Sequence, residues 1–128
     1  YGRIINVASV AGKEGGGFIA QYCASKFASI GLTQSLADAL MKTNITVNAV
    51  CPGIVWTQMW VHLSNAFKGV DSEMTAREYF TNVVEPNMIP QGRAQTVEDM
   101  GRQVLHYATM PNITGQSDNV DGGFSIAL

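Results

Sequence analysis

The chain has 128 residues, of which 46% are hydrophobic and 14% are charged. Soluble domains carry roughly 25% charged residues, so many positions of this chain must face other protein groups and not water. A chain of this length builds one domain and is too short for two. The formal net charge is −2, with Lys and Arg scattered singly, so we expect no basic stripe and no nucleic-acid partner.

Targeting segments, disulfides and metal sites are not indicated by the sequence. The chain starts at Tyr1 with a strand-like run that lacks the features of a signal peptide. No apolar run approaches the ~20 residues of a membrane span, so we expect a cytoplasmic protein without a membrane partner. Cys23 and Cys51 form no C-x-x-C pair, which favours packed free thiols. His62 and His106 lack a second ligand at metal spacing, so no metal is expected.

The first half of the chain predicts a strand, a helix and a strand. Residues 2–8 form a nearly continuous apolar run, typical of a parallel strand covered on both faces, and a glycine-rich loop follows at 11–17. Apolar and small residues then repeat at helical spacing over 19–42. Residues 45–51 alternate as a second strand, which Pro52-Gly53 ends. This order predicts a right-handed parallel crossover, with the chemistry beyond the carboxyl ends of the strands.

The second half predicts mainly helices. Residues 57–67 indicate a short helical or mobile piece, and a capping box at Thr75 opens a helix that Pro86 and Pro90 then break. A second capping box at Thr96 opens another helix.

A short last strand at 116–120 completes the expected fold. The fold class is α/β: a partial, doubly wound parallel sheet of Rossmann type, with about three parallel strands and flanking helices. Asn6 and Asn48 are polar residues in otherwise apolar strands, and we expect both to make structural hydrogen bonds because an unpaired buried amide is costly.

Tyr22 and Lys26 are the most informative pair in the sequence. A helix of about 3.6 residues per turn puts the Tyr22 phenol and the Lys26 ammonium on one face. A fixed cation beside a phenol favours its ionised form, and such a phenol could exchange a proton with an alcohol or carbonyl oxygen. The alternative is a solvated helix pair without chemistry, since this spacing is common by chance. Ser9 stands upstream, where the first strand would end.

The order of motifs resembles the short-chain dehydrogenase/reductase family. An apolar strand ends in Ser9, a glycine-rich loop follows, Tyr22-x-Ala-Ser-Lys26 opens a long helix, and a second strand ends in Cys-Pro52-Gly53. The likeness runs from residue 1 to residue 128. It implies that the Ser9 hydroxyl binds the substrate oxygen and that Tyr22 exchanges the proton. Lys26 would tune Tyr22 and, with it, hold the nicotinamide ribose.

The segment that follows the second strand resembles the family's Pro-Gly-x-x-x-Thr motif. By this resemblance Pro52 and Gly53 bring the backbone close to the cofactor, while the Val55 backbone and the Thr57 hydroxyl hold the nicotinamide carboxamide. Met59 and Trp60 come next, where the family places a mobile substrate lid. These two side chains either touch the substrate or serve ordinary helix packing. The same run looks most like family members that act on polyols, sugar alcohols or acetoin-type diols.

The resemblance implies an oxidoreductase that moves a hydride between NAD or NADP and an alcohol or ketone. It also implies a homo-oligomer, with the long helix 19–42 in a subunit interface. The family's usual chain is about twice as long, so residues 1–128 are expected to form a single partial domain, the carboxyl-terminal half, without the amino-terminal cofactor-binding half. The alternative is an inactive fragment or scaffold derived from such an enzyme. Asp118 departs from the family pattern, which has an apolar residue in the last strand.

Overall fold

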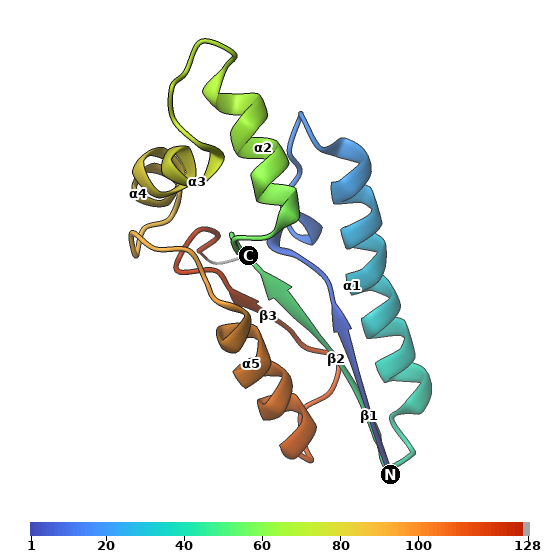
Figure 1. Cartoon of the computed structure of the whole chain (residues 1–128). Coiled ribbons are helices and arrows are strands. Elements are labelled where there is room, and N and C mark those ends of the chain that lie inside the picture. Colours follow the sequence, from blue (N-terminus) through green and yellow to red (C-terminus); the bar gives the residue numbers. More distant parts are fainter. Residues whose placement is uncertain (127–128) are drawn as a thin grey trace.

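The computed structural model describes residues 1–126, and its strands form one parallel sheet in the order β1–β2–β3 (Figure 1). The strands are β1 (Gly2–Val7), β2 (Ile45–Pro52) and β3 (Ser117–Val120). Parallel pairing joins β1 to β2 and β2 to β3. The predicted α/β fold with three parallel strands is therefore confirmed.

The central strand β2 holds the most deeply buried residues of the sheet. Val47, Ala49, Val50 and Cys51 are at most 1% exposed, because this strand has a neighbour on each side and helices on both faces. In contrast, Val7 of β1 is 60% exposed, although β1 has a similarly apolar sequence. Among the described residues, β1 therefore forms an apolar sheet edge with a neighbour on one side only.

Two long helices cover opposite faces of the sheet (Figure 1): α1 (Ala20–Leu40) and α5 (Val97–Thr109). The predicted helix over 19–42 is confirmed to within two residues at each end. Small side chains let α1 lie close to the sheet, where the Asn6 amide donates to the Thr33 hydroxyl at 2.8 Å. This bond confirms the structural role predicted for Asn6.

A group of shorter helices gathers beyond the carboxyl ends of the strands (Figure 1). It contains α2 (Gln58–Lys68), α3 (Ala76–Tyr79), the π-helical turn η2 (Phe80–Val84) and α4 (Glu85–Met88). The predicted break at Pro86 is wrong, because the helical path continues through it. Pro86 lies in the first turn of α4, where a missing N–H costs no intrahelical bond. We call residues 57–90 the lid segment.

Both predicted capping boxes are present. In the lid segment the Thr75 hydroxyl accepts from the Glu78 N–H at 3.1 Å, and the Glu78 carboxylate accepts from the Thr75 N–H at 2.7 Å. The latter bond lowers the pKa of Glu78. Thr96 and Asp99 make the same pair of bonds at the start of α5. The two sequence patterns thus locate two helix starts correctly.

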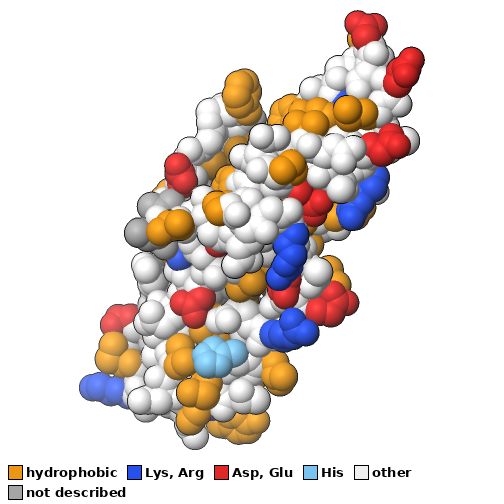
Figure 2. Space-filling model, turned by 90° about the vertical axis from the view of Figure 1, so that its left-hand side faces the viewer, with side chains coloured by type: hydrophobic (Ala, Val, Ile, Leu, Met, Phe, Trp, Pro, Cys, Tyr) orange, Lys and Arg blue, Asp and Glu red, His pale blue; other side chains and the backbone are white. Residues whose placement is uncertain are grey.

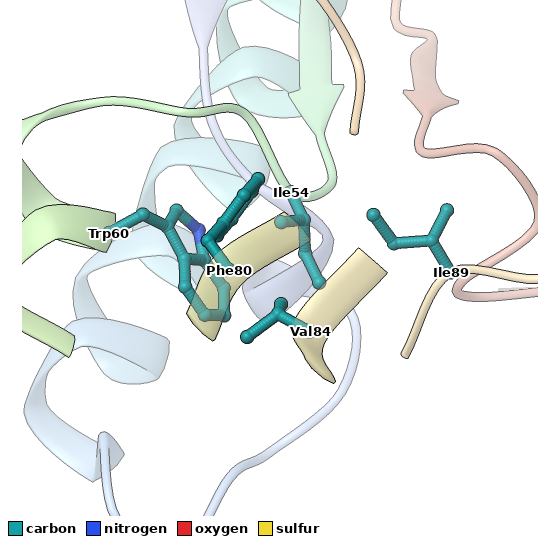
Figure 3. Close-up of a cluster of buried hydrophobic side chains, with 5 residues drawn as sticks. All are labelled: Ile54, Trp60, Phe80, Val84 and Ile89. Carbon is teal, nitrogen blue, oxygen red and sulfur yellow. The ribbon is translucent and has the colours of Figure 1, made fainter. Parts of the chain in front are cut away.

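Two separate hydrophobic clusters hold the chain together. One lies between α1 and the sheet and consists of small and aliphatic residues: Ala8, Ile30, Ala49 and Cys51. The other joins the end of β2 to the lid segment, and its side chains point toward one another in Figure 3: Ile54, Trp60, Phe80, Val84 and Ile89. The lid segment therefore packs on the end of β2 through its own core.

Polar contacts fasten β3 and the loop before it to β2 and α5. The Asn48 amide donates to the Ile113 carbonyl at 2.8 Å and accepts from the Gln116 N–H at 3.0 Å, as predicted for a structural asparagine. Asp118 is exposed and accepts from the Gln103 amide at 3.1 Å. The departure from the family pattern at Asp118 thus buries no unpaired carboxylate.

The face of the molecule that carries α5 mixes apolar and charged side chains. Figure 2 shows basic and acidic side chains interspersed with hydrophobic ones over this surface. Val97 and Leu105 of α5 are more than 60% exposed. Among residues 1–126, no helix combines the length and apolar character needed to cross a bilayer.

Candidate active site

The structure brings all of the predicted site residues to one pocket of about 280 Å³ at the carboxyl ends of β1 and β2. The sequence separates these residues by up to about fifty positions, and the parallel crossover reunites them. The predicted residues that line it are Ser9, Tyr22, Lys26, Pro52, Gly53, Val55, Thr57, Met59 and Trp60. Their chemical roles remain predictions, whereas their common location is a feature of the fold.

Ser9 lies where β1 ends and a short 3-10 turn, η1 (Val10–Gly12), begins. Its hydroxyl oxygen accepts from the Ala11 N–H at 3.1 Å, which fixes the side chain while the hydroxyl proton stays available for a second partner. Gly12 lets this turn pack on α1, because a Cβ there would come within 2.7 Å of the Lys26 carbonyl oxygen. The close contact sets the position of Ser9 relative to Lys26.

Tyr22 and Lys26 lie one turn apart on α1 and face the same pocket. The Lys26 ammonium lies 5.6 Å from the centre of the Tyr22 ring and donates a hydrogen bond to the Val7 carbonyl at 3.2 Å. That bond anchors the ammonium at the end of β1, two residues before Ser9. Both side chains are half-buried, so each remains reachable from the pocket.

The segment that follows β2 forms one side of the pocket. Gly53 is required here, because a Cβ would come within 2.6 Å of the Asp121 side chain. Two residues later, Val55 lines the pocket. Within residues 1–126, no hydrogen bond engages the main-chain N–H or C=O of Val55, so this donor and acceptor pair is available to a ligand.

Cys51 and Cys23 are buried free thiols, as predicted. Burial raises the pKa of the Cys51 thiol, and the nearby Asp118 carboxylate adds a smaller effect in the same direction. The thiol of Cys23 accepts from the Gly16 N–H at 3.3 Å. Both cysteines are therefore buried packing residues.

The far wall of the pocket is apolar. Met59 and Trp60 of α2 form part of it, and Trp60 also packs edge-on against Phe80 at 5.5 Å between ring centres. Val97 and Met100 of α5 complete the lining, and the sequence analysis missed both. The capping box at Thr96 is the signal that could have found them, since it places the first turn of α5 at this end of the sheet.

A second, more open groove of about 580 Å³ lies between α5 and β3. It contains none of the predicted site residues. Its Arg93 and Arg102 side chains share the Asp99 carboxylate, at 3.3 and 3.4 Å. No group of His, Cys, Asp and Glu among residues 1–126 has the arrangement of a metal site.

The sequence model of one protein family, described as short chain dehydrogenase, matches residues 1–67, slightly more than half of the chain. A diacetyl reductase of Staphylococcus aureus, described as forming (S)-acetoin, is 40% identical over 126 residues. That match covers 95% of this chain and 47% of the relative. The chain thus spans about half the length of the curated relatives that it matches.

Solved structures agree with this assignment. An actinorhodin polyketide ketoreductase solved with NADPH superposes with a TM-score of 0.83 and 35% identity, over 95% of this chain and 46% of the other. A xylitol dehydrogenase bound to NAD+ gives a TM-score of 0.80 and 29% identity, over 96% of this chain and 49% of the other.

Proposed function

Because the chain belongs to the short-chain dehydrogenase/reductase family, we propose that it is the carboxyl-terminal catalytic half of an NAD(P)-dependent oxidoreductase that interconverts an alcohol and a ketone. One observation supports this most strongly: Ser9, Tyr22, Lys26 and the Pro52–Thr57 segment all line a single pocket. A family remnant that served only as a scaffold would keep the fold but would have no physical need to retain a serine hydroxyl, a phenol and an ammonium at these positions.

In this proposal Tyr22 is the acid and base of the reaction. Its phenol gives a proton to the carbonyl oxygen during reduction and takes one from the alcohol during oxidation. Ser9 donates a hydrogen bond to the same oxygen, where negative charge grows in the transition state. The Lys26 ammonium lies beside the Tyr22 ring and is anchored on the Val7 carbonyl, so in this proposal its positive charge favours the negative charge that develops during proton exchange.

The residues present fit a nicotinamide cofactor. The unpaired N–H and C=O of Val55 offer one donor and one acceptor, which is the complement of a carboxamide. Thr57 lines the same pocket, and its hydroxyl would contact the carboxamide, while Lys26 and Tyr22 would contact the ribose. NAD or NADP supplies the hydride when bound. The phosphate-binding turn and the residues that select between these cofactors belong, in this proposal, to an amino-terminal half outside residues 1–128.

We further propose that the substrate is a polyol, a sugar alcohol or a small diol, or the matching ketone. Two of the three relatives described above support this choice, because one is named for diacetyl and acetoin and another for xylitol. We expect a cytoplasmic homo-oligomer in which α1 forms a subunit interface. Phe27 and Leu32, which are 47% and 56% exposed on α1, would be covered there.

The test is Tyr22→Phe in the complete enzyme. We expect turnover to fall by about a thousandfold or more, in the range typical of a lost proton donor, while cofactor affinity stays close to that of the wild type. Tyr107→Phe is the matched control, because Tyr107 is fully buried, does not line the pocket, and has a hydroxyl that accepts from the Asp118 N–H. Substantial residual turnover in Tyr22→Phe would remove Tyr22 from the mechanism. A wild-type protein that reduces no ketone would contradict the proposed activity and favour the alternative of an inactive scaffold.

A further inference from the structure

We propose that Gln95 is a positioning residue, which turns the main-chain N–H and C=O of Val55 into the pocket to hold the cofactor carboxamide. This inference rests on the proposed function, because it concerns the same pocket. Gln95 lies in the loop that precedes α5 and is 6% exposed. It is 41 positions from Ile54 in the sequence, and no motif in the sequence analysis pointed to it.

Gln95 binds both main-chain groups of Ile54. The Ile54 N–H donates to the Gln95 side-chain oxygen at 2.9 Å. The Gln95 main-chain N–H donates to the Ile54 carbonyl at 2.9 Å. One residue therefore satisfies the donor and the acceptor of the residue that directly precedes Val55.

These two bonds determine which way Val55 faces. Val55 and Gln95 form an isolated parallel bridge, so the chain is locally extended. In extended chain, successive residues direct their N–H and C=O to opposite sides. Because the Ile54 groups point toward Gln95, those of Val55 must point away from it. Val55 lines the pocket, and its groups are unpaired within residues 1–126.

The Gln95 amide is also tightly confined. A Cβ on Gly53 would come within 2.8 Å of its oxygen, and a Cβ on Gly122 within 2.7 Å of its nitrogen. The amide nitrogen of Gln95 also donates a hydrogen bond to the Arg93 carbonyl at 3.4 Å. The side chain is thus held between two backbone segments and cannot swing away from Ile54. A side chain of equal length without the amide would keep the packing but lose the bond to the Ile54 N–H.

The alternative is a purely structural role, in which Gln95 fastens the loop to the end of β2 and affects only the stability of the fold. The two interpretations differ in the cofactor affinity of correctly folded enzyme. A fastening role lowers the melting temperature and leaves the dissociation constant for the cofactor unchanged. A positioning role weakens cofactor binding even in molecules that are folded, and it affects the carbonyl substrate far less.

The experiment compares Gln95→Met, Gln95→Glu and Gln91→Met in the complete enzyme. Calorimetry measures the dissociation constant for NADH or NADPH, whichever the wild type binds more tightly, and steady-state kinetics give KM for the carbonyl substrate. Gln95→Met matches the length of the side chain but removes the amide. Gln95→Glu retains an oxygen for the Ile54 N–H. Gln91 is exposed on the neighbouring loop and controls for the loss of a surface amide.

We expect Gln95→Met to weaken cofactor binding by about tenfold, as for one lost hydrogen bond, with KM for the carbonyl substrate nearly unchanged. Gln95→Glu, which keeps an oxygen for the Ile54 N–H but turns a second one toward the Arg93 carbonyl, should weaken binding less than Gln95→Met. Gln91→Met should bind the cofactor almost as the wild type does. Unchanged cofactor affinity in folded Gln95→Met overturns the inference.

If that variant does not fold, Gln95→Asn replaces it, because its amide is one methylene too short to reach Ile54. A wild type without cofactor binding contradicts the proposed function itself, whereas an active wild type with an insensitive Gln95 contradicts only this inference.

Discussion

The two hydrophobic clusters of the molecule support the pocket in different ways. Beneath Ser9 and Lys26, the cluster between α1 and the sheet uses small side chains, so backbones approach closely and Gly12 touches the Lys26 carbonyl. Across the pocket, the lid segment is held by large rings, with Trp56 and Phe80 only 4.7 Å apart between ring centres. The first cluster fixes the positions of reacting groups through backbone contacts, and the second shapes a wall through side chains.

This difference indicates how each side responds to substitution. Close-packed backbone leaves a side chain few alternative positions, which suits groups that must hold a proton within hydrogen-bond reach. A wall built from aromatic side chains can change shape without moving those groups. Substitutions on the α1 side should therefore reduce turnover, whereas substitutions in the lid segment should act on substrate affinity and local stability.

The largest effect that separates the two sides is expected from Lys26→Ala. Removing the ammonium takes away the cation beside the Tyr22 ring and the anchor on the Val7 carbonyl. In the complete enzyme both turnover and cofactor affinity should fall, with turnover lower by about a hundredfold or more. Lys42→Ala, at an exposed position beyond the end of α1, should behave as the wild type. A loss confined to turnover would remove the ribose contact proposed for Lys26.

A second substitution probes the lid cluster. Phe80 is fully buried and contacts both Trp56 and Trp60. Phe80→Ala should lower the free energy of unfolding by about 3–5 kcal/mol, as for other buried aromatic residues. In enzyme that remains folded, KM for the carbonyl substrate should rise more than turnover falls. Phe67→Ala, at a position that is 55% exposed on α2, is the control for chemical denaturation and kinetics. A drop in turnover with unchanged KM would contradict the division between the two sides.

The smallest effect concerns Glu78, which caps α3 in the lid segment. Hydrogen bonding to the Thr75 N–H lowers its pKa below the ordinary value of ~4.3. Its stabilising effect is therefore complete above the unfolded-state pKa and is lost as the pH falls through the folded-state pKa. Glu78→Gln should speed amide hydrogen exchange over residues 75–84 at pH 7, and this difference should shrink toward acidic pH. Glu73→Gln, on the exposed loop before Thr75, should leave the exchange rates unchanged at every pH.

The sequence predicts the catalytic side of the molecule well. Continuous apolar runs and helical spacing locate β1, α1 and β2, and their order alone brings Ser9, Tyr22 and Lys26 to one end of the sheet. The motif after β2 places Val55 and Thr57 at the same pocket. These predictions succeed because they depend on local patterns and on the handedness of a parallel crossover, which few alternatives satisfy.

The lid segment and Gln95 could not be predicted in the same way. A proline such as Pro86 usually ends a helix, yet here the helical path continues from a π-helical turn into α4. Gln95 belongs to no periodic pattern, and its role depends on a contact with Ile54, which is 41 positions away in the sequence. Both features arise from tertiary packing between segments that the sequence does not mark as neighbours.

The π-helical turn at Phe80–Val84 is a place where the lid segment could change in length. A π-helical turn holds one residue more than the regular spiral around it. Loss of a single residue there would let the turn relax to regular α-helix and would shift the side chains of the turn itself, while β1, β2 and α1 kept their register. One-residue deletions in this turn, scored by substrate range, would reveal whether length variation alone can redirect the enzyme toward new compounds.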